Sequence, residues 1–150
     1  MPFPEHVFRH TPALRGKVKP PSESEMRFGL ERFEELEQQA IAEGWPADWR
    51  MDHDEREANR LQILGDRIGR DLWVFGYGSL IWDPAVEVEE YRYGSLPGWR
   101  RSFCMRLEGG RGSRQQPGLM AALDEGGHCD GVVLRIPAPV VDQETQFMWR

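Results

Sequence analysis

Apolar residues recur every three or four positions in two stretches of the first half of the chain, a spacing that predicts amphipathic helices. The stripe of the first helix consists of Met26, Leu30, Phe33, Leu36 and Ala40. Ser22 and Glu25 have the spacing of a capping box at its start, and Gly44 and Pro46 are expected to end it.

A second helix is predicted over residues 54–68, because Asp54 is a suitable N-cap and Gly69 a suitable C-terminal stop. Its expected buried face comprises Ala58, Leu61, Leu64 and Ile68. We expect both helices to pack on the domain behind them, and a partner-binding or dimerising arm is the alternative. Residues 1–21 hold five prolines without periodicity, which predicts an extended tail.

From residue 71 the hydrophobic period shortens and turn residues become frequent, which predicts strands. Leu72–Phe75 is a short apolar run that ends in glycine, as expected of a buried strand. Side chains alternate over residues 99–107, and residues 119–123 and 131–136 are further strand candidates. The segments GGRGSRQQPG and DEGGHCD are expected to be the turns that join them.

The change of character near residue 70 divides the chain into two predicted parts. Residues 1–70 form a tail with a helical extension, and residues 71–150 form a second domain that returns to a helical pattern over 139–150. The predicted fold class is α+β, with a mainly antiparallel sheet or small barrel and flanking helices.

Composition excludes several classes of protein. The chain is 39% hydrophobic and 11% aromatic, which argues against disorder, and no apolar run has the length of a membrane span. The net charge of −6 argues against a nucleic-acid partner. Residues 1–21 lack the apolar core of a secretory signal, so we expect a cytoplasmic protein. Cys104 and Cys129 are expected to be buried free thiols, with a single bridge as the alternative.

The most specific motif is the segment Trp73–Trp82, WVFGYGSLIW. Glycines at 76 and 78 can take positive φ and let a ligand approach the backbone, whose N–H groups can form an anion-binding nest. Such a nest suits an amino-acid carboxylate, and Tyr77 and Ser79 can add hydroxyl contacts. Isoleucine at 81 and the lack of lysine after residue 70 exclude a dinucleotide fingerprint, a nucleophile elbow and a P-loop. A plain turn between buried strands is the alternative.

The segment Val74–Trp82 resembles the opening signature of the ChaC family of γ-glutamylcyclotransferases. The resemblance continues in order through WRRSF (99–103), RGSRQQPG (111–118), LMAAL (119–123), DGVVLRIP (130–137) and FMWR (147–150). It spans about residues 71–150 and leaves residues 1–70 outside.

The resemblance implies a lyase that degrades glutathione. The α-amino group of the substrate would attack its own γ-carbonyl and release 5-oxoproline and cysteinylglycine, with no metal or organic cofactor. Such chemistry needs a general base for the amine and N–H donors for the developing oxyanion. The implied partner is a small molecule, with no nucleic acid and no membrane, and the oligomeric state is left open. The residues implied to bind the γ-glutamyl group are Val74, Phe75, Gly76, Tyr77, Gly78 and Ser79.

The resemblance places the catalytic glutamate just after the segment matched by Phe147–Arg150, so no catalytic residue is assigned within this sequence. We expect a truncated homologue with an incomplete barrel, either as a fragment, as a truncated gene product or as an incomplete record. Glu144 and Asp142 are the nearest acids, and both are expected to be solvated carboxylates on a helix face rather than substitutes for the base. The alternative function is a non-catalytic γ-glutamyl-binding or regulatory protein that uses residues 22–68 as a partner surface.

Three weaker constellations have more ordinary explanations. His128 and Cys129 would make a poor dyad, because neighbours in a strand point to opposite faces. The sequence Asp-His-Asp at 52–54 is a weak metal signal, and Asp54 is better explained as a helix cap. A possible anion patch for the carboxylates of glutathione, with solvated arginines as the expected alternative, comprises Arg100, Arg101, Arg111 and Arg114.

Overall fold

The computed structural model describes residues 2–46, 50–109 and 112–150. Short 3₁₀ helices precede and separate its longer elements, for example at Glu5–Phe8 before the first of them and at Ser79–Ile81 (η5). The longer elements are the helices α1 (Leu30–Ala42), α2 (His53–Leu64) and α3 (Val141–Met148) and the strands β1 (Leu72–Gly76), β2 (Glu90–Leu107) and β3 (Gly118–Ile136).

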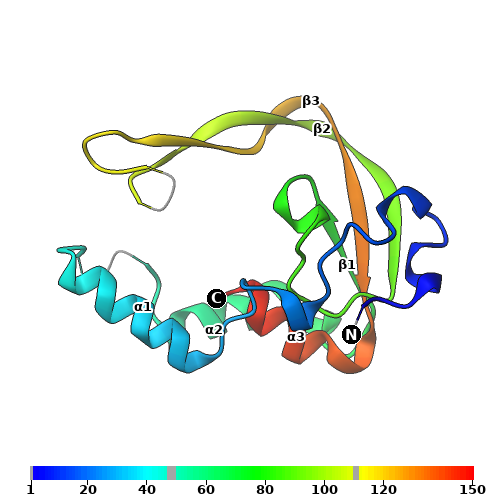
Figure 1. Cartoon of the computed structure of the whole chain (residues 1–150), viewed down its shortest axis with the longest axis horizontal. Helices are drawn as coiled ribbons and strands as arrows, with labels where there is room; N and C mark the ends of the chain where they lie inside the picture. The colour runs from blue at the N-terminus through cyan, green and yellow to red at the C-terminus, as the bar shows by residue number, and fades with distance from the viewer. Residues whose placement is uncertain (1, 47–49, 110–111) are drawn as a thin grey trace.

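The three strands form one antiparallel sheet in the order β1-β3-β2. β1 pairs only with the last residues of β3, from Leu72 opposite Ile136 to Gly76 opposite Val132. The rest of β3 pairs with β2 alone, so the two strands continue as a long two-stranded ribbon (Figure 1). The predicted α+β class, the strand at 72–75 and the helix near the end of the sequence are confirmed.

One predicted turn is wrong, because DEGGHCD lies inside β3 rather than between two strands. Gly126 and Gly127 have φ of 100° and 71°, and Gly98 on the facing strand has φ of 84°. The register shifts at this point, between Pro97 and Trp99. Glycines with positive φ therefore make an irregularity that bends the ribbon without ending it, and residues 119–123 and 131–136 belong to one strand.

The core lies where the sheet meets α3 and the first residues of the chain. Every second side chain near the end of β3 is buried, namely Val132, Leu134 and Ile136. The Phe8 ring stacks on the buried ring of Tyr91, with centroids 5.4 Å apart. The prediction of an extended tail is therefore wrong. The prolines begin short 3₁₀ helices, where fixed φ is favourable, and these helices bury apolar side chains.

Helix α1 begins later than predicted. Gly29 is its N-cap, without a side-chain cap hydrogen bond, so Ser22 and Glu25 lie before the helix and not at its start as predicted. Of the predicted stripe, Phe33 is buried, while Met26 and Leu30 are exposed. The end of the helix near Gly44 is as predicted.

The buried face of α2 differs from the predicted one. Its N-cap is Asp52, which accepts the N–H of Glu55 at 2.8 Å, and not Asp54. Ala58 and Leu61 are exposed, whereas Leu64 is buried as predicted. Two arginines, Arg56 and Arg60, lie on the buried side instead. A hydrophobic pattern cannot locate such a face, because charged side chains form it.

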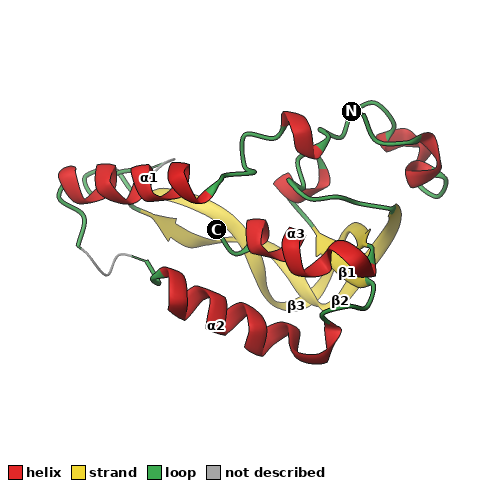
Figure 2. Cartoon of the chain, turned by 90° about the horizontal axis from the view of Figure 1, so that it is seen from below, coloured by secondary structure: helices red, strands yellow, loops and turns green. Residues whose placement is uncertain are grey.

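Arg60 explains why α2 turns this face inward. Its guanidinium donates to Thr145 Oγ1 at 2.7 Å and to Asp142 Oδ1 at 2.8 Å, both on α3. It also binds Glu57, one turn earlier on α2, at 2.7 Å. Figure 2 shows α2 and α3 on the same side of the sheet. Across the described ranges, no helix is long and apolar enough to cross a membrane.

Candidate functional site

The glycine loop predicted from the sequence lies at the end of β1. After Gly76 the chain passes through Tyr77 and Gly78 into η5. The turn is closed by Ile81 N–H to the Gly78 carbonyl at 3.0 Å and by Trp82 N–H to the Ser79 carbonyl at 2.9 Å. In Figure 1 this green loop rises from β1 toward the β2–β3 ribbon.

Two glycines on neighbouring strands allow β1 to sit close against the sheet. A Cβ atom at Gly131 would lie 2.3 Å from the Gly76 carbonyl oxygen and 2.9 Å from the Phe75 ring. At Gly94 it would lie 2.7 Å from a methyl carbon of Val133. The absent side chains therefore make room for the Phe75 ring and the start of the loop, a role that the strand pattern alone did not reveal.

The expected reason for glycine in the loop needs correction. Neither Gly76 nor Gly78 has positive φ, and φ of Gly78 is −145°. A Cβ at Gly76 would touch Leu80 and Val132, both at 3.4 Å. A Cβ at Gly78 would meet nothing within 4 Å. Gly78 therefore leaves its backbone open to approach, whereas Gly76 fits into a packed position.

The six predicted binding residues are consecutive in the chain and differ in burial, and Val74 packs against the hydrophobic core. Gly76 is buried, Val74, Phe75 and Tyr77 are half-buried, and Gly78 and Ser79 are exposed. The rings of Phe75 and Tyr77 stack with centroids 6.5 Å apart. Among the hydrogen bonds between described residues, none uses the N–H of Gly78 or of Ser79. The loop thus has N–H and hydroxyl groups next to the two stacked rings. Such donors can bind a carboxylate or a carbonyl oxygen.

The chain after the loop is held by Arg27, a residue outside the family resemblance. Ala85 has φ of +60°, unusual for a residue with a side chain, and its carbonyl accepts Arg27 Nη1 at 2.8 Å. Arg27 also binds both carboxylate oxygens of Glu144 on α3, at 2.5 and 2.8 Å. Its guanidinium lies 3.9 Å from the centre of the Phe147 ring. These contacts fix the exit of the loop against α3.

Glu144 is therefore not the solvated carboxylate that we expected. It is 1% exposed, and its Oε2 also accepts the N–H of Glu87 at 2.8 Å. Both of its oxygens are occupied by donors from other segments, so its role is to join them to α3. Asp142 matches the expectation, because its side chain is largely exposed and pairs with Arg60.

The N-terminal segment also holds the loop. Lys19 N–H donates to the Trp82 carbonyl at 2.7 Å, and its ammonium lies 3.5 Å from Asp83 Oδ2. Beneath the loop, burial raises the pKa of the Tyr91 hydroxyl, and the charge of Asp83 adds to this effect. Residues on both sides of position 70 thus contribute to one structure around the loop.

The other candidates have separate roles. His128 is exposed while Cys129 is buried, as expected for neighbours on opposite faces of a strand. Both cysteines are free, but Cys104 is exposed, so the prediction of two buried thiols is wrong for it. No group of three or more histidine, cysteine or acidic side chains within the part of the chain that is described is arranged to hold a metal ion.

The predicted anion patch consists of separately engaged arginines. Arg100 pairs with Asp124 at 2.8 Å, and Arg101 donates to the Asp130 carbonyl at 3.3 Å. Arg114 lies 5.1 Å from the Trp45 ring centre. All three are exposed, which confirms the expectation of solvated arginines. Arg111 lies outside the described residues.

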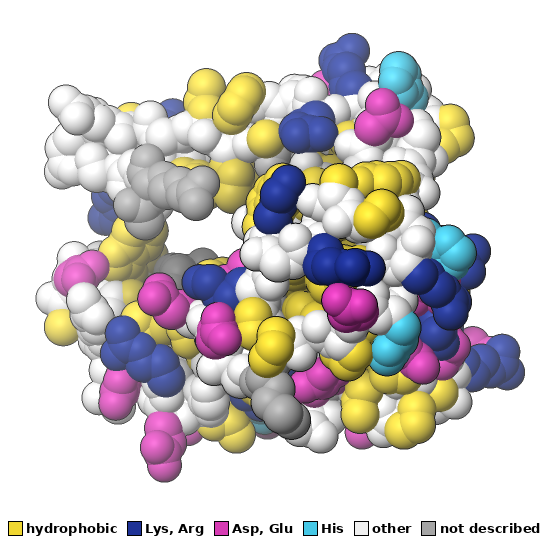
Figure 3. Space-filling model, turned by 45° about the vertical axis from the view of Figure 1, so that its right-hand side comes forward, with side chains coloured by type: hydrophobic (Ala, Val, Ile, Leu, Met, Phe, Trp, Pro, Cys, Tyr) yellow, Lys and Arg dark blue, Asp and Glu magenta, His cyan; other side chains and the backbone are white. Residues whose placement is uncertain are grey.

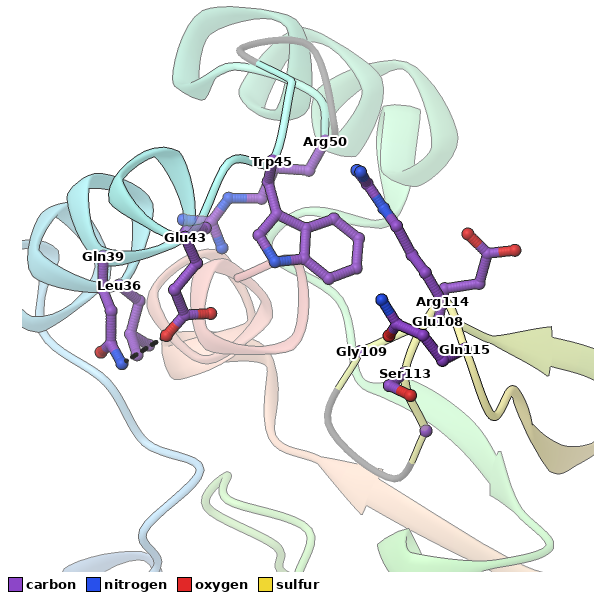
Figure 4. A pocket seen from close by; sticks show the side chains of 12 residues that line it. Leu36, Gln39, Glu43, Trp45, Arg50, Glu108, Gly109, Ser113, Arg114 and Gln115 are labelled. Atoms are coloured by element: carbon purple, nitrogen blue, oxygen red, sulfur yellow. Dashed lines mark hydrogen bonds between the residues drawn. The ribbon is translucent and has the colours of Figure 1, made fainter.

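A pocket of about 770 Å³ lies between the end of α1 and the tip of the ribbon, away from the glycine loop. Figure 4 shows Trp45, Glu43 and Arg50 on one side of it and Glu108 and Arg114 on the other. Its lining mixes both signs of charge. Figure 3 shows the opening between the ribbon and the helices below it.

Comparison with known proteins places the matched region in the second half of the chain. The family model described as "ChaC-like protein" matches residues 72–150. The glutathione-specific γ-glutamylcyclotransferase of Escherichia coli strain K12 is 51% identical over 79 residues, which are 53% of this chain and 34% of that protein. The protein of the same name from Schizosaccharomyces pombe is 36% identical over 94 residues, covering 51% of this chain and 45% of that protein.

A crystal structure of a yeast γ-glutamyl cyclotransferase specific to glutathione aligns with 53% of this chain and 46% of that chain, at 22% identity and a TM-score of 0.48. This chain therefore spans less than half the length of each of these relatives.

Proposed function

Since the chain belongs to the ChaC-like protein family, we propose that it forms the γ-glutamyl-binding part of a γ-glutamylcyclotransferase that acts on glutathione. The observation that carries the proposal is the open glycine loop after β1, fixed by the N-terminal segment on one side and by Arg27 and α3 on the other. We place residues 71–150 in the cyclotransferase domain and residues 1–70 in an N-terminal extension.

The proposed reaction is an intramolecular cyclisation. The α-amino nitrogen of the γ-glutamyl group forms a bond to the γ-carbonyl carbon, the bond from that carbon to the cysteinyl nitrogen breaks, and the proton lost by the amine ends on the leaving amine. The products are 5-oxoproline and cysteinylglycine, which makes the enzyme a carbon–nitrogen lyase. Holding the substrate in a bent conformation supplies much of the rate, because both reacting atoms belong to one molecule.

We assign the holding of the substrate to Val74, Phe75, Gly76, Tyr77, Gly78 and Ser79. In this assignment, the open backbone at Gly78 admits the γ-glutamyl group, and the unused N–H groups of Gly78 and Ser79 donate to its carboxylate or to the developing oxyanion. In the same assignment, the rings of Phe75 and Tyr77 exclude water from one side of the bound γ-glutamyl group.

The general base is assigned to the glutamate that family members carry after the segment matched by Phe147–Arg150. Glu144 is not proposed, because its carboxylate is engaged by Arg27 and by Glu87 N–H. The same observation supports the second candidate, a protein that binds γ-glutamyl compounds without turning them over. We place either protein in the cytoplasm, with a small-molecule partner and no cofactor.

The test is to incubate the chain with glutathione and to measure 5-oxoproline and cysteinylglycine by mass spectrometry, with calorimetric binding measured in parallel. Turnover by this chain would mean that a base lies within these residues and would contradict the assignment of the base to the glutamate after Arg150. Binding without turnover is expected of the γ-glutamyl-binding part. Absence of both would contradict the proposal. A preference for γ-glutamyl amino acids over glutathione in a substrate panel would contradict the assigned substrate.

A further inference from the structure

A second, smaller pocket lies on the helical side of the molecule, apart from the glycine loop. It has a volume of about 220 Å³. Its lining residues come from the start of α1, from α2 and from the end of α3 with the residues after it, and Figure 2 shows the end of α3 between α1 and α2. The lining residues are Leu30, His53, Arg56, Glu57, Gln146, Trp149 and Arg150.

Arg56 is the most unusual member of this lining. It is 8% exposed, yet its guanidinium forms no hydrogen bond with any residue in the described part of the chain, and its Nη2 is buried without a partner. The guanidinium carbon lies over the Phe33 ring, at 3.9 Å from its centre. A buried charge without a hydrogen-bonded counter-ion is costly, so the position favours a partner that carries negative charge.

Arg150 is the second arginine of the pocket and also favours a partner that carries negative charge. Arg150 donates Nη1 to the Phe28 carbonyl at 2.8 Å and forms no ion pair within the described ranges. Burial lowers the pKa of Arg56, and the charges of Arg50 and Arg150 lower it further. The charges of Glu37 and Asp52 raise this pKa without reversing the shift. Burial also lowers the pKa of Arg150, against an opposing effect of the Glu57 charge.

The acid that lines the pocket is already engaged. Glu57 accepts Arg60 Nη2 on one oxygen at 2.7 Å and Arg60 Nε on the other at 2.8 Å. The Trp149 indole is likewise occupied, because it donates to Asn59 Oδ1 at 3.0 Å. The donors that remain for a ligand come from Arg56, Arg150, Gln146 and His53. Although the net charge of the chain is −6, this small pocket is rich in positively charged donors.

We propose that this pocket binds a compact oxyanion, a carboxylate or phosphate group, between the guanidinium groups of Arg56 and Arg150. Both anions match the planar, multiple-donor geometry of arginine. The volume favours a small anionic group, because pockets for larger organic ligands start at about 300 Å³. The site is separate from the γ-glutamyl loop and does not depend on the function proposed for that loop.

The test is a calorimetric titration of the whole chain with inorganic phosphate and, separately, with acetate, at constant ionic strength maintained with chloride. Saturable binding of at least one of them is expected. Tighter phosphate binding would assign a phosphate group, and tighter acetate binding a carboxylate. A chain that binds neither anion would overturn the proposal.

Three variants test whether the anion binds at Arg56 and Arg150. Arg56→Met and Arg150→Met should each weaken binding by about tenfold or more, because each removes a charge-assisted donor pair. Arg67→Met is the matched control, since Arg67 is exposed, bonds only to the Ile63 carbonyl and lies outside the pocket. Arg150→Met guards against the case in which Arg56→Met fails to fold. Equal losses of affinity in Arg67→Met and Arg150→Met would also overturn the proposal.

Discussion

The two ends of the β2–β3 hairpin differ in the burial of their side chains, although both are formed by the same two strands. We define the packed region as residues 90–97 and 128–136, and the arm as residues 99–107 and 118–125, on the other side of the irregularity at Gly98. Leu134 in the packed region is 0% exposed, while Leu119 in the arm is 65% exposed.

The difference comes from what covers each region. The 3₁₀ helices of the N-terminal segment and α3 bury the side chains of the packed region. No comparable layer of described residues lies on the arm, where Phe103 is 73% exposed. Strand pairing alone gives little stability to a two-stranded ribbon. The glycine loop lies at the packed end, so the same contacts that build the core also hold the candidate site.

The largest expected effect comes from truncating one leucine in each region. Leu134→Ala should lower the free energy of unfolding by about 3 kcal/mol, because it leaves a cavity in the core. Leu119→Ala, the same change on the same strand, should alter it by less than about 0.5 kcal/mol. Urea denaturation measures both. Similar losses for the two variants would mean that the arm is covered in solution.

The next effect compares a buried ion pair on α3, which covers the packed region, with an exposed ion pair on the arm. Arg27→Met should cost about 3 kcal/mol, because it leaves the buried carboxylate of Glu144 without its bidentate partner. Arg100→Met, which breaks the exposed pair with Asp124 on the arm, should cost no more than about 1 kcal/mol.

A double variant separates charge from packing at this position. In Arg27→Met with Glu144→Leu, no unpaired charge remains, so most of the lost stability should return. The free energies come again from urea denaturation. A double variant no more stable than Arg27→Met would show that Arg27 acts through its packing on Phe147 and not through Glu144.

A smaller, pH-dependent effect is expected at Glu90, at the start of β2. A hydrogen bond from Arg92, with Arg9 as a further donor, lowers the pKa of this carboxyl to about 2. A lowered pKa in the folded state means stabilisation that is complete above the unfolded value of about 4.5 and lost as the pH falls toward 2.

Glu90→Gln should therefore destabilise the protein by about 1–2 kcal/mol at neutral pH, since the two hydrogen-bonding partners of this buried carboxylate, Arg9 and Arg92, are themselves exposed. The difference in melting temperature between parent and variant should disappear between pH 4.5 and pH 2 in thermal melts. Asp124→Asn on the arm is the control and should show a gap near zero throughout. A gap for Glu90→Gln that does not change with pH would refute this assignment.

The sequence predicted those parts of the fold that have a clear period or a specific motif. The sequence predicts the strand at 72–75, the glycine loop after it and a helical segment over 139–150, of which 141–148 is helical in the structure. They are local features, in which apolar spacing or glycine placement determines the structure.

The sequence did not predict features that depend on distant partners. Arg60 turns α2 toward α3 through Thr145, 85 positions away, and Arg27 reaches Glu144 across 117 positions. The burial of Glu144 follows from Arg27, so the helix pattern around Glu144 could not reveal it. The sequence around Gly126 and Gly127 predicts a turn where the structure has a bend in β3, because such glycines occur equally well in a turn and in a strand irregularity.

The most direct test of the central claim, that the loop after β1 binds the γ-glutamyl group, is calorimetric titration with glutathione of the parent chain and of Gly78→Val. A Cβ atom at this position would meet no protein atom within 4 Å, and Gly78 is exposed, so the melting temperature should be nearly unchanged. We predict that the parent binds glutathione and that Gly78→Val does not, because its side chain occupies the open approach to the backbone. Equal affinity in the two proteins would contradict the claim and leave the loop as a turn between buried elements.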